Sequence, residues 1–281
     1  MFRLFLLLFL FHSFNVGANT QALIREDVYQ FYLKFLNGRD VQKINEFKGE
    51  YIRRDVVDMI LVQQALKIGG KELTFDFFPG KADYRNAQMM KQGKSLLSFD
   101  TYWLSDATEL EPDVYISSAI IRKGEYFAGI FANPNNTKVF QLSKLEHFKN
   151  LTSVSTPRWR ADWQTLLNLP LKRLHREDEW VSQARMVREM FVDFFMMPLN
   201  MSHKGQYIIR NVILKQVPNV ALLLDDSRHF VISKKHPDGF EAYHAIQRGV
   251  AKMRSRGQIV KAYTDAGFFR DLSEYNVINE H

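Results

Sequence analysis

The sequence predicts an α/β protein built as two lobes, with mixed, mostly parallel sheets flanked by helices. Two observations lead to this prediction. Strand-like and helix-like segments alternate along the chain, and the alternation starts again after the turn-forming residues 133–136. The chain also has 281 residues, 46% of them hydrophobic, which is enough for two cores of ordinary size. Two such units suggest a cleft, where ligands lie beyond the carboxyl ends of the strands.

The first residues have the layout of a secretory signal peptide. Arg3 precedes eight apolar residues at positions 4–11, and small residues stand at Val16 and Ala18. We therefore expect a signal peptide over residues 1–18, removed after Ala18, and export to the periplasm. A second possible cleavage site lies at residues 20–22, and an uncleaved N-terminal anchor is the alternative reading.

The first unit reads as an alternation of strands and helices. Residues 28–36 are rich in aromatic and β-branched side chains and stop at a turn dipeptide, which predicts a strand. Residues 51–68 carry apolar side chains at helical spacing and end at two glycines. A strand over 73–78, a helix over 82–91 and a strand over 95–104 complete the unit.

The second unit repeats the alternation. We expect strands at 126–132, 151–154 and 192–197, and helices at 145–149, from 155 to about 167, and at 179–190. Strands at 219–224 and 228–233 then precede helices at 242–256 and 259–266.

Composition excludes several kinds of chemistry. The chain has no cysteine, so thiolate nucleophiles, iron–sulfur clusters and Cys-based zinc sites are excluded. It has no HExxH, P-loop, GxGxxG or GxSxG motif, so we expect no metal, no cofactor and no enzymatic activity. A net charge of +7 over this length is modest and does not indicate a nucleic-acid partner.

Several stretches together resemble the type II periplasmic solute-binding proteins, in particular the amino-acid-binding components of ABC transporters. The resemblance is carried by residues 142–151, 156–160, 187–195, 230–235 and 248–257, in that order. It implies a first lobe of residues 23–122 plus 229–281 and a second lobe of residues 123–228. It also implies two hinge crossovers and closure of the lobes around a ligand.

Two departures bear on the ligand that the resemblance implies. Amino-acid binders of this family carry an arginine for the α-carboxylate, but residues 105–111 contain none. They also carry a second aspartate for the α-amino group, whereas Asp193 is followed by two phenylalanines and two methionines. An ordinary α-amino acid is therefore not the expected ligand.

Four residues of the first lobe are candidate ligand contacts. Asp100, Tyr102 and Trp103 stand at the carboxyl end of a predicted strand, with Asp100 and Tyr102 on one side and Trp103 on the other. A buried aspartate needs a donor, a water molecule or a ligand. Arg85, at the start of a predicted helix, is either a ligand contact or part of an ion pair that stabilises the lobe.

Five residues of the second lobe are also candidates. Thr156 has the position of a helix N-cap, and a helix N-terminus binds anions. Arg158 and Arg160 in the first turn oppose the helix dipole, which suggests an anionic ligand; two exposed arginines are the alternative. Trp159 offers a stacking surface or packs between lobes, and Met197 lines the cleft or belongs to the core.

These observations favour an exported, monomeric binding protein that clamps a small anionic or aromatic-stacking ligand and passes it to an ABC permease or a membrane sensor. Contact with the membrane would be peripheral and made through those partners. A docking or signalling module on the same fold is one alternative. A small-molecule lyase or dehydratase, with Asp100 or Asp193 as general acid, is another.

Overall fold

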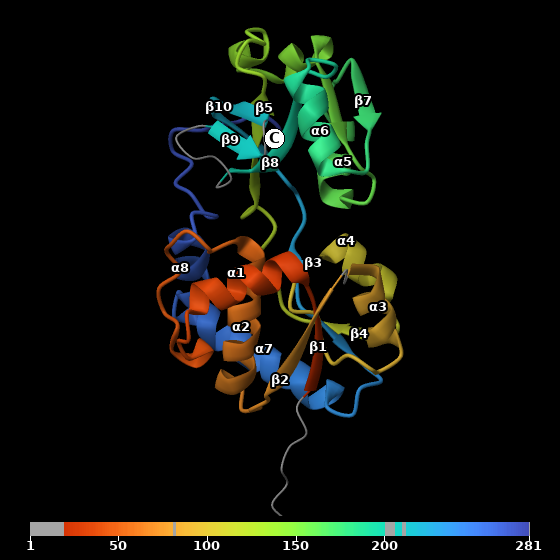
Figure 1. Ribbon diagram of the computed structural model, residues 1–281, viewed down its shortest axis with the longest axis vertical. Helices are drawn as coiled ribbons and strands as arrows, with labels where there is room; N and C mark the ends of the chain where they lie inside the picture. Colours follow the sequence, from red (N-terminus) through yellow and green to blue (C-terminus); the bar gives the residue numbers. More distant parts are fainter. Residues whose placement is uncertain (1–19, 81–82, 200–205, 210–211, 281) are drawn as a thin grey trace, which may run out of the picture.

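The structure is a computed structural model that describes residues 20–80, 83–199, 206–209 and 212–280. Figure 1 shows two lobes stacked along the longest axis of the molecule. Each lobe combines sheets with flanking helices, so the predicted two-lobed α/β fold is confirmed. The expected signal peptide, residues 1–18, lies outside the described residues.

The first lobe consists of short sheets covered by helices. β1 pairs with β2 in parallel, whereas the pairs β3–β11 and β4–β12 are antiparallel. The elements before the crossover are β1 (Thr20–Arg25), α1 (Glu26–Leu36), η1 (Val41–Lys43), α2 (Arg54–Ile68), β2 (Phe75–Gly80), α3 (Asp83–Lys91), β3 (Tyr102–Trp103), α4 (Leu104–Ala107), η2 (Thr108–Leu110) and β4 (Val114–Ile116). Those after the return are β11 (Arg228–His229), β12 (Val231–Ser233), α7 (Gly239–Ser255) and α8 (Gln258–Asp265).

The second lobe is built on one mixed sheet of seven strands in the order β13-β10-β5-β8-β6-β7, with β9 paired to β10. Its strands are β5 (Phe127–Ala132), β6 (Thr152–Ser155), β7 (Arg173–Arg176), β8 (Phe194–Pro198), β9 (Gln206–Ile209), β10 (Val212–Leu223) and β13 (Asn276–Val277). Its helices are η3 (Val139–Gln141), η4 (Leu145–Asn150), α5 (Arg160–Leu167) and α6 (Trp180–Arg188).

Two neighbouring segments connect the lobes. The Leu224 amide donates to the Tyr126 carbonyl, and the Lys123 ammonium lies 2.9 Å from an Asp225 carboxylate oxygen. The end of the chain makes a further crossing, because β13 pairs with β10 in the second lobe. Residues 276–277 therefore lie with the second lobe and not, as expected, with the first.

The predicted strand at residues 28–36 is wrong, because these residues form helix α1. Val28, Tyr32 and Phe35 recur at helical spacing and are all buried on one face. Asp27 and its neighbour Glu26 occupy the first turn, where negative charge favours a helix N-terminus. Helical periodicity thus prevailed over the strand preference of the aromatic residues.

The predicted strand at residues 95–104 is largely wrong as well. Only β3 is a strand, and helix α4 begins directly after it. The Ser98 hydroxyl donates to the Asp100 carbonyl at 2.6 Å, a local contact that competes with regular strand pairing. The segment therefore reaches the end of the lobe as an irregular extended chain.

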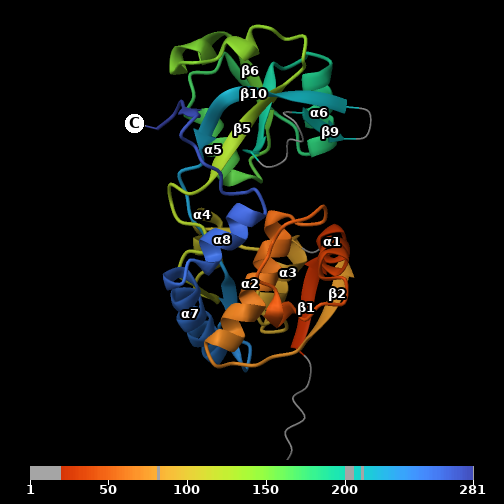
Figure 2. The same cartoon turned by 90° about the vertical axis from the view of Figure 1, so that its left-hand side faces the viewer.

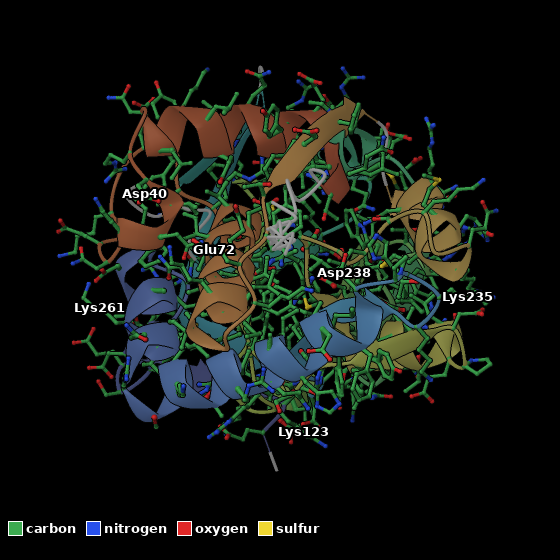
Figure 3. All side chains as sticks on the ribbon, turned by 90° about the horizontal axis from the view of Figure 1, so that it is seen from below. Asp40, Glu72, Lys123, Lys235, Asp238 and Lys261 are labelled. Carbon is green, nitrogen blue, oxygen red and sulfur yellow. The ribbon has the colours of Figure 1, made fainter. Side chains whose placement is uncertain are left out.

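Surface charge on the first lobe is of mixed sign. Near the start of α7, Lys71 pairs with Asp238 at 2.7 Å and Lys235 pairs with Asp113 at 2.8 Å. Figure 3 shows Lys235 and Asp238 beside that helix, seen from below. Two of the lysines near this end of α7 are thus paired with carboxylates.

Helix α2 is the centre of the first lobe and packs closely against α7 (Figure 2). Glycines allow the two backbones to approach. A Cβ atom on Gly249 would lie 2.0 Å from the Ala65 carbonyl oxygen, and one on Gly69 would lie 1.8 Å from the Ala245 carbonyl oxygen. A side chain at either position would therefore force the two helices apart.

We predict that Gly249→Ala lowers the free energy of unfolding by about 2–3 kcal/mol, because overpacking outweighs the gain in helix propensity. Urea denaturation measures this change. The control is Ala251→Gly, at an exposed position of the same helix, which should cost about 1 kcal/mol. A Gly249→Ala protein as stable as the parent would contradict the close contact.

Candidate functional site

The first lobe presents the carboxyl ends of β1 and β2 and the N-terminus of α2 towards the second lobe (Figure 1). Arg25 closes β1, and Arg54 opens α2. In open α/β sheets this edge is where ligands bind. The charged side chains gathered here therefore form the candidate site.

A buried carboxylate organises this edge. Asp58 is fully buried and accepts hydrogen bonds from the Thr101 amide at 3.1 Å and the Thr101 hydroxyl at 2.7 Å. The Tyr263 hydroxyl and the Arg54 guanidinium donate to the same carboxylate. Four donors from three segments thus converge on one side chain, which satisfies a charge that would otherwise be costly to bury.

Arg228 extends this arrangement to the second crossover. It is 8% exposed, and its Nε donates to the Thr101 hydroxyl at 2.8 Å. Its guanidinium carbon lies 4.6 Å from the centre of the Trp103 ring, and that ring lies 4.8 Å from the ring of Tyr126. The residues after the crossover are thereby tied to the extended segment before α4.

Asp100 lies against the same two arginines. Its Oδ1 is 2.8 Å from Arg54 Nη1 and 3.6 Å from Arg228 Nη2. This oxygen is buried and has no well-directed hydrogen bond, although the side chain as a whole is 30% exposed. Burial opposes ionisation, but the two guanidinium groups outweigh it and lower the pKa of Asp100. Asp100 is therefore an anion at neutral pH.

Two further arginines at this edge are also paired with carboxylates. Arg25 Nη2 lies 2.7 Å from Asp27, and Arg53 Nη2 lies 2.8 Å from Asp55. Arg53 Nη1 reaches Asp27 as well, at 3.1 Å. Each of these arginines therefore has a carboxylate partner within the first lobe.

In the second lobe, the prediction that Thr156 caps a helix is wrong. Helix α5 begins at Arg160, and its N-cap position is occupied by Trp159, which makes no side-chain capping bond. The Thr156 hydroxyl instead accepts from the Arg158 amide at 3.2 Å and donates to Asp178 at 2.6 Å. Arg158 Nη2 lies 3.5 Å from the same aspartate, so these residues form a turn that precedes the helix.

Arg160 reaches from the second lobe to the first. Its Nε lies 3.1 Å from Asp106 Oδ1, on α4, and its Nη2 donates to Glu109, on η2. The arginine predicted to meet an anionic ligand therefore meets carboxylates of its own chain.

Asp162, in the first turn of α5, has a shifted pKa. Burial raises the pKa of Asp162 to about 6, and the charge of Asp106 acts in the same direction. Its own backbone amide and the Arg228 guanidinium act in the opposite direction without cancelling this effect.

The remaining predicted site residues do not join this group. Tyr102 packs beside the small core cluster that contains Met90 and Val231. Arg85 is exposed in the first turn of α3. Met197 is 7% exposed and belongs to the core cluster between the second sheet and α6.

Asp193, the other candidate acid, has a structural position. Its carboxylate accepts from the Thr152 amide at 2.7 Å and from Asn136 at 3.0 Å, and it pairs with Lys138 at 2.6 Å. Although burial opposes it, these donors lower the pKa of Asp193, which favours the ionised form over a proton donor.

Sequence reasoning missed Arg54, Asp58, Asp162 and Arg228. A signal for Asp58 was present, since a charged residue stands inside the apolar run of α2, where every residue from Asp55 to Leu66 is buried. The i, i+4 spacing of Arg54 and Asp58 was a second local signal, whereas the partners that Thr101, Arg228 and Tyr263 supply are distant in sequence.

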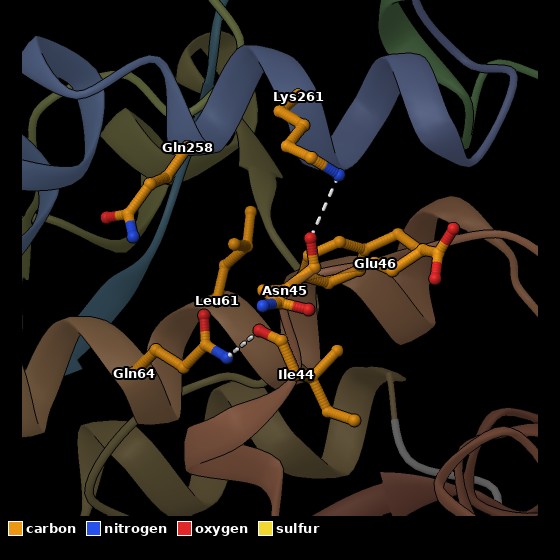
Figure 4. Close-up of a pocket in the computed structure, with 8 residues that line it drawn as sticks. Ile44, Asn45, Glu46, Leu61, Gln64, Gln258 and Lys261 are labelled. Atoms are coloured by element: carbon orange, nitrogen blue, oxygen red, sulfur yellow. Dashed lines mark hydrogen bonds between the residues drawn. The ribbon is translucent and has the colours of Figure 1, made fainter.

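A cavity of about 360 Å³ lies within the first lobe, apart from this charged edge. It is lined by Ile44, Asn45, Glu46, Phe47, Leu61, Gln64, Gln258 and Lys261. Figure 4 shows that two of its polar groups already have partners: Gln64 donates to the Ile44 carbonyl and Lys261 to the Asn45 carbonyl. The other polar side chains of the lining are those of Asn45, Glu46 and Gln258.

Within the described ranges, no three His, Asp or Glu side chains are grouped so that they could hold a metal ion. No helix in that same part of the chain is long and apolar enough to cross a membrane.

We predict that Asp162 makes stability depend on pH. Its pKa of about 6 exceeds the unfolded value of about 3.9, so the folded state binds more protons and loses stability as pH rises between these values. The loss should be about 1–2 kcal/mol, since Asp162 is only partly buried.

Urea denaturation from pH 4 to 7 tests this. Asp162→Asn should reduce the decline without abolishing it, because burial raises the pKa values of Asp58 and Asp106 as well. The control Asp178→Asn should retain it, because hydrogen bonds from Arg176 and Thr156 lower the pKa of Asp178. An identical decline in the parent and Asp162→Asn would show that Asp162 is not responsible.

No protein-family model and no curated protein sequence matches this chain. Solved structures do resemble it. The GluR0 ligand-binding core in complex with L-glutamate has a TM-score of 0.57 at 9% identity, over 91% of this chain and 100% of that one. The periplasmic VFT2 domain of Bordetella pertussis BvgS has a TM-score of 0.56 at 10% identity, over 89% and 93%.

A third similar structure is the ancestral amino acid-binding protein AncCDT-1, a precursor of cyclohexadienyl dehydratase. Its TM-score is 0.52 at 12% identity, over 90% of this chain and 96% of that one. These likenesses extend over both lobes at very low identity. The chain therefore has the two-lobed fold of the periplasmic amino-acid-binding proteins, in a divergent sequence.

Proposed function

We propose that this protein is a solute-binding protein that holds a small molecule between its two lobes and passes it, unchanged, to an ABC transporter or a membrane sensor. The observation that carries the proposal is an ion pair between the lobes beside a charged edge of the first lobe. Arg160 of the second lobe meets Asp106 of the first, and the first lobe also carries Asp100 and Trp103 at this end.

The similar structures support a binding role. The GluR0 ligand-binding core is in complex with L-glutamate, and AncCDT-1 is an amino acid-binding protein. We also propose export to the periplasm through a signal peptide over residues 1–18, followed by a mature monomer. The charged, apolar and small residues at the N-terminus support this.

We propose lobe boundaries near residues 122 and 229, with residues 276–277 assigned to the second lobe. The paired crossover segments support the first two boundaries, and the strand pairing of β13 supports the assignment of the chain's end.

Among the candidate contacts, Asp100 and Trp159 are the best placed for a ligand. Asp100 is an anion with a buried oxygen that lacks a well-directed hydrogen bond. Trp159 is 39% exposed, whereas Trp103 is 6% exposed and one of its neighbours is the Arg228 guanidinium. This favours a ligand that stacks on the lobe-2 ring. We also propose four further ligand contacts at the edge of the site: Arg85, Tyr102, Thr156 and Arg158.

A docking or signalling module is the second candidate function. One observation favours it. Arg53, Arg54 and Arg160, which lie where the lobes face each other, form ion pairs with carboxylates of the chain itself, and this reduces the positive charge available to a ligand. Catalysis is not part of either proposal, because the pKa values of both Asp100 and Asp193 are lowered. The dehydratase precursor among the similar structures makes a turnover control worthwhile.

Native mass spectrometry of the protein purified from its own periplasm tests the binding function. We expect one small molecule per chain, released on denaturation with its chemistry unchanged. Trp159→Ala should lose that molecule. The matched control is Trp180→Ala, an exposed tryptophan that begins α6 in the same lobe and should retain it.

Two other results would contradict the binding proposal. A protein with no bound molecule and no thermal shift with any metabolite mixture would favour the docking module. The protein is also incubated with the released compound and, separately, with prephenate-like acids. Chemical conversion of any of these compounds would indicate an enzyme.

A further inference from the structure

We infer that Arg160 is a latch that holds the two lobes together when no ligand is bound. The latch consists of Arg160 on α5 of the second lobe and of Asp106 and Glu109 on the first lobe. This goes beyond ligand binding, because it concerns the shape of the protein before any ligand arrives.

The guanidinium of Arg160 forms ion pairs with two carboxylates of the first lobe. Arg160 Nε lies 3.1 Å from Asp106 Oδ1, while Nη2 is bonded to the carboxylate of Glu109. Two nitrogens of one planar guanidinium thus engage two separate carboxylates, and the fixed directions of its donors hold both carboxylates in one geometry. By contrast, Arg158 in the preceding turn pairs within its own lobe, with Asp178.

The position of Arg160 in its helix points the same way. It is the first residue of α5, where a positive charge opposes the helix dipole. Local structure therefore does not favour an arginine at this position. The carboxylates across the lobe interface offset that cost, and they do so only when the lobes are close together.

The latch is weak enough to be released. The side chains of Arg160, Asp106 and Glu109 are 43%, 31% and 60% exposed, so water and salt screen their attraction. Exposed pairs of this kind change an equilibrium about two- to fivefold. The latch would therefore raise the closed fraction of the free protein and reduce the conformational cost of binding, without preventing opening.

The absence of cysteine makes the test direct, since introduced cysteines are the only labelling sites. Lys48→Cys on the first lobe and Lys172→Cys on the second place spin labels at exposed positions of the two lobes. The protein is first unfolded in urea and refolded by dialysis, which removes any bound molecule. Electron paramagnetic resonance then measures the distance between the labels.

We expect Arg160→Ala to reduce the closed-to-open ratio about two- to fivefold. Raising the salt concentration to 1 M should shift the parent towards the open form and leave Arg160→Ala nearly unchanged. Arg160→Glu should open the lobes further, and adding Glu109→Arg should restore closure. The matched control is Arg188→Ala, which removes an arginine of similar exposure that pairs inside the second lobe with Glu189.

An unchanged distance distribution in Arg160→Ala, or equal shifts in Arg160→Ala and Arg188→Ala, would overturn the latch. Because the measurement uses no ligand, such a result would leave the proposed binding function untouched. Failure to find a ligand would equally leave the latch standing.

Discussion

The buried carboxylate of Asp58 is the interaction on which the site-bearing end of the first lobe depends. It receives donors from Arg54 at the start of α2, from Thr101 in the segment before α4, and from Tyr263 on α8. Through Thr101 it also fixes Arg228, directly after the second crossover. One charge thus joins the ligand-facing edge to the hinge, and its removal would leave two guanidinium groups without their shared partner network.

Charge balance is the main property of the region where the lobes meet. The arginines of the first lobe face Asp27, Asp55, Asp58 and Asp100, and Arg160 faces Asp106 and Glu109. Arg158 and Arg160, predicted in a first helical turn, suggested an anionic ligand, but the structure supplies their counter-charges internally. The charges of this region are therefore largely matched within the chain itself.

Sequence periodicity predicted the two lobes and helices such as α2, because their information is local. It failed at α1, where aromatic residues suggested a strand although their spacing was helical. Strand-end reasoning put Trp103 on the side opposite to Asp100 and Tyr102. It could not find Arg228, which contacts both Asp100 and Trp103 and whose partner Thr101 lies 127 residues away. Met197 was ambiguous for a related reason: both faces of its strand are buried, so strand alternation does not distinguish a site residue from a core residue.

The most direct test of this account is the stability of Asp58→Asn in urea. The account predicts a loss of about 3–5 kcal/mol, because the buried arginines lose one of their two carboxylates and the Thr101 and Tyr263 donors lose their acceptor. Asp27→Asn removes the same charge from arginine partners at a site where the side chain is 50% exposed, and it should cost less than about 1 kcal/mol. Equal and small losses for the two variants would contradict the claim that Asp58 holds the site together.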